Sequence, residues 1–276
     1  MKMNRITPIA VALTLGIVST AQATSISHST LGVLGADDFE SQTLGSTFSS
    51  QLSSPTSSGQ TGWDVNAGGA GVGNVVTSAG PTGAAQGSQF VTMFNAGTSA
   101  TGNNYNQRLD IKNVVPSDAG DITATFSFFV DSSPTAAQTG SFGFELSSTD
   151  TAGWAMLAAS WDRNGGINVG CRSCTWVSGT IPTDEWLTAE FTYHVVDGTL
   201  NDTIDAKISS MQGAGVLFST TGIAVAGDDL RNINSANFYA DNYGSVYLDA
   251  IPEPSTAAML GIGALLVAGL RRRTAR

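Results

Sequence analysis

The sequence predicts an all-β protein, a jelly-roll β-sandwich, and three observations carry this prediction. Apolar residues recur with a period of two, most clearly over residues 122–130, where Ile, Ala, Phe, Phe and Val alternate with polar residues. No window shows the apolar stripe of an amphipathic helix. Charged residues make up only 12% of the chain, which is too few for the exposed faces of a helix bundle.

Further strands are expected on the same grounds over residues 90–94, 108–111, 142–146, 154–161, 187–195, 203–208, 238–239 and 246–249. Gly, Asp and Asn separate them, and residues 162–166 carry a strong hairpin signal. Residues 41–88 are rich in Ser, Thr, Gly, Gln and Ala. We expect them to form long loops around a strand or two, with disorder as the alternative.

The first residues have the features of a secretory signal peptide. A basic segment (residues 1–5) precedes an apolar one (residues 6–18), and Ala21 and Ala23 form an A-x-A cleavage site. We therefore expect signal peptidase to remove residues 1–23, a signal helix, so that the mature chain begins at Thr24.

The last residues combine an apolar segment with a basic end. Residues 257–270 carry no charge and as a helix would span about 21 Å, less than the hydrocarbon core of about 30 Å. The basic stop Arg271, Arg272 and Arg273 should stay on the cytoplasmic side. This leaves residues 24–250 as one extracytoplasmic domain. An ordinary C-terminal anchor is the plainer alternative.

Directly before the apolar segment stand Pro252, Glu253 and Pro254. A Pro-Glu-Pro tripeptide, a short apolar helix and an Arg cluster in this order resemble the PEP-CTERM sorting signal of Gram-negative bacteria. The resemblance covers residues 251–276. It implies processing by an exosortase-type membrane enzyme, transient contact with the inner membrane through residues 257–270, and delivery to the cell surface or extracellular matrix.

The expected domain is strongly acidic. Residues 24–250 contain 6 Lys and Arg against 21 Asp and Glu, a net charge near −15. Such a surface repels phosphate backbones, so nucleic acid is excluded as a partner, whereas divalent cations and neutral sugars remain possible.

The two cysteines, Cys171 and Cys174, form a C-x-x-C pair. Zinc would need two further ligands, and the two histidines do not have metal-ligand spacing. A redox motif would need a helix after the first cysteine, and the flanks look like strands. A local disulfide at a hairpin is favoured in an exported protein.

The order of elements resembles that of concanavalin A-like (laminin G-like) jelly rolls. The segments that carry this resemblance are residues 37–40 as an early strand, residues 185–193 as a Trp-led strand followed by Asp197 and Gly198, and residues 247–249 as a final strand that returns beside the first. Immunoglobulin-like and other carbohydrate-module sandwiches are the alternatives.

Catalytic motifs are not evident. The paired carboxylates of a glucanase on this fold are missing around Glu145, and the chain has no G-x-S-x-G elbow. His194 falls on the polar side of its strand, which favours a solvated surface histidine.

Two binding hypotheses remain. Asp37, Asp38 and Asp249 would supply the oxygen ligands of a structural calcium ion if the first and last strands meet; otherwise they are solvated edge residues. Trp154, Trp161, Trp176 and Trp186 could stack on sugars, although buried tryptophans are commoner in sandwiches. No other cofactor is expected.

The sequence therefore predicts an exported, non-enzymatic surface or matrix protein associated with exopolysaccharide or biofilm. A true carbohydrate-binding module and a secreted glycan hydrolase with an unrecognised site are the alternatives.

Overall fold

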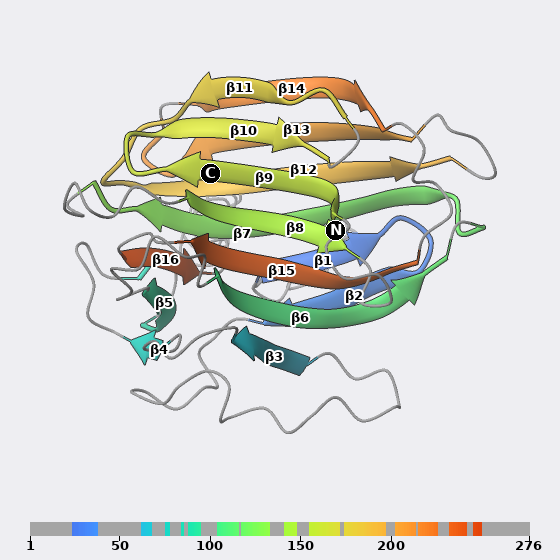
Figure 1. Ribbon diagram of the computed structural model, residues 1–276, viewed down its shortest axis with the longest axis horizontal. Helices are drawn as coiled ribbons and strands as arrows, with labels where there is room; N and C mark the ends of the chain where they lie inside the picture. Colours follow the sequence, from blue (N-terminus) through green and yellow to red (C-terminus); the bar gives the residue numbers. More distant parts are fainter. Residues whose placement is uncertain are drawn as a thin grey trace, which may run out of the picture.

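Two antiparallel β-sheets, of nine and seven strands, form the protein in the computed structural model (Figure 1). The structure describes residues 24–37, 62–67, 75–77, 84–85, 88–94, 104–115, 117–132, 141–147, 155–171, 174–196, 202–213, 215–225, 232–241 and 245–249. The expected signal helix and C-terminal apolar helix lie outside these residues.

The nine-stranded sheet is called sheet A. Its strands in spatial order are β14 (Val216–Ala224), β13 (Thr203–Ser210), β12 (Trp186–Val195), β7 (Gly120–Val130), β16 (Ser245–Asp249), β5 (Phe90–Phe94) and β4 (Val75–Thr77). The remaining two are β1 (Thr24–His28), which pairs with β7, and β2 (Gly32–Asp37), which pairs with β1.

The seven-stranded sheet is called sheet B. Its spatial order is β11 (Val177–Thr180), β10 (Gly166–Gly170), β9 (Ala155–Asp162), β8 (Ser141–Ser147), β15 (Ile233–Asp241), β6 (Asn104–Val114) and β3 (Gly62–Ala67). The predicted hairpin at residues 162–166 joins β9 to β10.

The chain crosses repeatedly between the sheets. β5 in sheet A is followed by β6 in sheet B and β7 in sheet A; β8 to β11 lie in sheet B, β12 to β14 in sheet A, then β15 in sheet B and β16 in sheet A. These crossings bring strands that are distant in sequence side by side, as in a jelly roll. No helix occurs among the described residues. The predicted all-β jelly-roll sandwich is confirmed.

Aromatic rings fill the space between the sheets. Phe126 on β7 lies centrally, with its ring centroid 4.9 Å from that of Phe238 and 5.1 Å from that of Phe144. Trp161 on β9 lies 4.5 Å from Phe128. All of these side chains are buried, because the period-two pattern directs alternate residues of each strand into the core.

A smaller apolar cluster lies on the other face of sheet A. Phe129 follows Phe128 in β7 and therefore points away from the main core. It packs edge to face with Trp186 on β12 and with Tyr247 on β16. This cluster explains why the end of β7 is buried on both faces.

The structure differs from the sequence prediction at the domain's beginning and end. The first strand is β1 at Thr24, and β2 ends at Asp37 rather than beginning there. The last strand, β16, does not lie beside the first. Instead, β1 and β16 follow one another along the same edge of β7.

Candidate functional site

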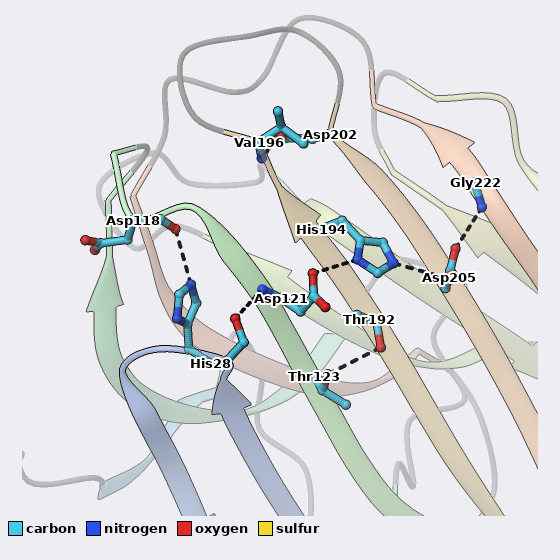
Figure 2. A network of polar contacts seen from close by, with 11 residues as sticks. His28, Asp118, Asp121, Thr123, Thr192, His194, Val196, Asp202, Asp205 and Gly222 are labelled. Carbon is cyan, nitrogen blue, oxygen red and sulfur yellow. Dashed lines mark hydrogen bonds and ion pairs between the residues drawn. The ribbon is translucent and has the colours of Figure 1, made fainter.

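His194 lies on the outer face of sheet A between two carboxylates (Figure 2). Its Nδ1 is 2.7 Å from Asp121 Oδ1, and its Nε2 is 3.3 Å from Asp205 Oδ2. The three residues come from neighbouring strands, β12, β7 and β13. Because both ring nitrogens face an acceptor, the arrangement fits the doubly protonated imidazolium.

The charges around His194 favour this protonated form. Partial burial lowers the pKa of His194, but the hydrogen bonds to Asp121 and Asp205 and the negative charges of both carboxylates outweigh burial, so that the pKa is raised above the ordinary value for histidine. The side chain is 30% exposed, so solvent screens the pair.

The polar contacts of His194 with Asp121 and Asp205 continue in a line across sheet A to the neighbouring strands. The backbone N–H of Asp121 donates to Ser29 Oγ at 3.0 Å, and the N–H of Gly222 donates to Asp205 Oδ1 at 2.7 Å. The line therefore runs from the β1–β2 turn to the edge strand β14 (Figure 2). It braces one end of sheet A.

His28 has a different, structural role at this end of the sheet. Its buried ring accepts the N–H groups of Thr30 and Leu31 at Nδ1, both at 3.2 Å. Its Nε2 lies 3.2 Å from the carbonyl oxygen of Asp118 (Figure 2). These contacts assign the proton to Nε2. His28 therefore closes the turn that follows β1.

The described residues contain no group of three or more His, Cys, Asp and Glu side chains that could hold a metal ion. Both ring nitrogens of His194 are engaged by carboxylates from the neighbouring strands. The network around His194 therefore braces three strands of sheet A. The sequence placed His194 on the correct face but did not identify its two partners.

The outer face of sheet B carries two aromatic rings that pack against glycines. A Cβ atom built on Gly143 of β8 would overlap the ring of Tyr239 on β15, and one built on Gly170 of β10 would lie 3.0 Å from Cδ2 of Trp176. Both rings therefore lie against the backbone of the sheet. Trp176 keeps 43% of its surface exposed, and Tyr239 is half-buried.

Two rows of paired residues across sheet B connect these rings. The strand register places Asn168, Ser160, Gly143 and Tyr239 in one row, and Gly170, Ala158, Glu145 and Asn237 in the next. Their neighbours along each strand are core residues, so these positions face outward. We call this region, from Trp176 to Asn237, the aromatic face. Its two rings stand over strands two places apart, a separation of about 10 Å.

Glu145 is the one carboxyl group in these two rows. Desolvation by burial raises its pKa above the ordinary range. It lies between Ala158 on β9 and Asn237 on β15. The Asn237 side chain in turn donates from Nδ2 to Ser147 Oγ at 2.6 Å. The face thus offers amides, hydroxyls and one carboxyl group with a raised pKa.

The two cysteines support one end of this face. Cys171 and Cys174 form a disulfide between the ends of β10 and β11, with their Cα atoms 5.0 Å apart. Trp176 follows two residues after Cys174. The disulfide therefore shortens the connection that places the indole ring over Gly170.

The four tryptophans considered from the sequence do not form one platform. Trp161 and Trp186 are buried, 1% and 8% exposed, and only Trp176 among the described ones is available to a ligand. Trp154 lies outside the described residues. The sequence prediction of sugar-stacking residues did not include Tyr239. Gly143 pointed to such a ring, because a glycine inside a strand pattern marks the close approach of another group.

Of the three predicted calcium ligands, the structure describes the side chain of Asp249 alone. Asp249 ends β16 and is fully buried. Asp37 is the backbone partner of Thr24, and its side chain, like all of Asp38, lies outside the described residues. The calcium site stays a prediction.

The sorting residues Pro252, Glu253 and Pro254 and the stop Arg271, Arg272 and Arg273 also lie outside the described residues. Among the residues that the structure describes, none belongs to a helix with the length and apolar character needed to cross a membrane.

Several solved structures share features of this fold at low similarity. A sialidase is 7% identical with a TM-score of 0.42, covering 68% of this chain; the chain spans only 16% of that protein. Lectin II from Ulex europaeus is 15% identical (TM-score 0.38, covering 69% and 92% of the two chains), and peanut lectin is 13% identical (0.37, 68% and 94%). No curated protein matches the sequence.

One family model matches the chain, and it does so at the C-terminus. Residues 250–273 match the PEP-CTERM protein-sorting motif. This match contains the Pro-Glu-Pro tripeptide, the apolar segment and the three arginines identified from the sequence. The chain therefore carries a PEP-CTERM sorting signal, which implies export and processing by an exosortase at the membrane of a Gram-negative bacterium.

Proposed function

We propose that this is a non-enzymatic protein of the cell surface or extracellular matrix that associates with neutral exopolysaccharide through the aromatic face of sheet B. The observation that carries the proposal is the packing of Trp176 and Tyr239 against Gly170 and Gly143. A ring held against the backbone loses little conformational freedom when a sugar stacks on it.

The chemistry between the rings suits a neutral polyhydroxylated ligand. Asn168, Ser160 and Asn237 supply donors and acceptors, and Glu145 with its raised pKa adds a carboxyl group. Binding sites for small polar ligands combine such groups with aromatic surface. The acidic domain as a whole disfavours strongly anionic polymers.

A carbohydrate-binding module in the strict sense differs from this proposal only in affinity and selectivity. A glycan array probed with the exported chain, with and without calcium, measures both. We expect binding to neutral glycans, and Trp176→Ala to weaken it by about tenfold or more, as for an aromatic anchor. Val216→Ala, which trims an exposed residue on β14 in the other sheet, is the control.

A second variant tests the geometry without removing an aromatic residue. Gly143→Ala adds a methyl group where the Tyr239 ring lies, so the ring must move away from the sheet. Glycan binding should fall as it does in Tyr239→Ala. If both variants and Trp176→Ala bind glycans like the parent, the aromatic face is not the binding site and the proposal fails.

Glu145 favours a hydrolase as the second candidate, because a carboxyl group with a raised pKa can act as a general acid. A glycosidase also needs a second carboxylate about 5–10 Å away. Incubation of the protein with each bound glycan tests this function directly. We expect no reducing ends to form; product that disappears in Glu145→Gln would establish hydrolysis instead.

A further inference from the structure

One edge of β7 is shared by β1 and β16, the first and last strands in the order of the sequence. β1 pairs with β7 over Ile122–Thr125, and β16 pairs with it over Ser127–Val130. Both run antiparallel to β7, so they run in the same direction as each other. They lie in line along β7 (Figure 1). Together they form one interrupted strand.

The interruption is a missing peptide bond rather than a missing residue. Asp249 stands opposite Ser127, and Ser25 stands opposite Thr125, which leaves only the position opposite Phe126. Thr24 precedes Ser25, is 1% exposed, and has its Oγ1 3.5 Å from the carbonyl oxygen of Asp249. Thr24 thus follows Asp249 as if it were the next residue of the strand. We call this point the junction.

The carboxylate of Asp249 is buried at the junction. Asp249 is fully buried, and so are its neighbours Ser25 and Ser127, 6% and 0% exposed. A buried carboxylate needs charge or hydrogen bonds to compensate for lost hydration. In the interrupted strand, the nitrogen of Thr24 takes the place of the peptide nitrogen that would follow Asp249.

Export changes the charge of this nitrogen. Hydrolysis of the bond between Ala23 and Thr24 leaves a carboxylate on Ala23 and an ammonium group on Thr24. A neutral peptide nitrogen thereby becomes a cation beside the buried Asp249.

We propose that the new α-ammonium group of Thr24 pairs with the Asp249 carboxylate and locks β1 and β16 end to end, so that removal of the signal peptide completes sheet A. The proposal is independent of glycan binding.

Among the residues that the structure describes, the other ionisable ones near the junction are Asp37, which pairs with Thr24 through the backbone, Tyr247 on β16, and Glu190 on β12, which pairs with Thr125 of β7. None of them carries a positive charge. The ammonium group is therefore the cation that export adds to an acidic neighbourhood.

The test compares exported chains whose N-termini differ by one residue. Insertion of one glycine between Ala23 and Thr24 keeps the A-x-A site but moves the new ammonium group away from Asp249. Both forms are combined with Asp249→Asn, and mass spectrometry verifies each N-terminus. We expect the extra glycine to lower the thermal midpoint by about 2–4 °C in the Asp249 protein, and to have little effect in Asp249→Asn.

A glycine effect of equal size in both backgrounds would overturn the lock. A second measurement needs only the two chains that retain Asp249, and so holds even if Asp249→Asn does not fold. The difference between their midpoints should be at its full size up to about pH 8, where a free α-amino group loses its proton, and should shrink at higher pH, because the paired ammonium group holds its proton longer. A difference that does not change with pH also overturns the proposal.

Discussion

His194 shows how one side chain depends on contacts made by three strands. Its ring nitrogens reach Asp121 and Asp205, which are 73 residues and 11 residues away along the chain. The alternation of β12 predicts that His194 faces outward. It does not predict which residues of β7 and β13 lie opposite, because the register between strands is a long-range property.

The raised pKa of His194 leads to a pH-dependent stability. The protonated ring contributes its full stabilisation below the ordinary histidine pKa of about 6.5, and this is lost as the pH rises through the higher folded-state pKa. His194→Gln should therefore destabilise the protein by up to about 1 kcal/mol near pH 5.5, and by less near pH 9. Urea unfolding at the two pH values measures the difference.

Thr188→Ala, on the same face of β12, is the matched control and should leave the pH dependence unchanged. If the His194→Gln variant loses the same stability at both pH values, the effect comes from packing rather than from the charged pair.

At the scale of the elements, β7 organises the domain. One edge pairs with β12 over Gly120–Phe129 and the other with β1 and β16, while its inward residues fill the core. The sequence identified this strand because its alternation is unbroken. It missed β11 and β14, whose burial patterns alternate weakly because both lie at sheet edges.

Phe126→Ala tests the central role of β7. The ring contacts aromatic residues from four other strands and is fully buried, so its removal leaves a cavity. We expect a loss of about 3–5 kcal/mol in the free energy of unfolding. Thr125→Ala, the preceding residue on the outer face, should cost far less. Similar losses for the two variants would contradict this description of the core.

At the scale of the whole molecule, the first and last strands meet at the junction. This arrangement predicts that a circular permutant joining Asp249 directly to Thr24, with new ends in the exposed turn at Gln212 and Gly213, folds to the same sandwich. Far-ultraviolet circular dichroism should show β-structure, and unfolding should stay cooperative.

A permutant that joins Asp249 to Ser25 and omits Thr24 is a strict control. The deletion shifts the register of β1 by one residue, which would turn Ile26 out of the core. It should be markedly less stable than the first permutant. Equal stability of the two permutants would show that the strands do not form one continuous register.

The sequence by itself determined what depends on neighbouring residues: the strands with unbroken alternation, the sorting motif at residues 250–273, and the acidic character of the domain. Only the tertiary structure decided which residues meet across strands. Tyr239 over Gly143, His194 between two carboxylates and Thr24 beside Asp249 each depend on register between segments distant in the chain. Alternation fixes the face of a strand, whereas pairing fixes its neighbours, and pairing is set by packing of the whole sandwich.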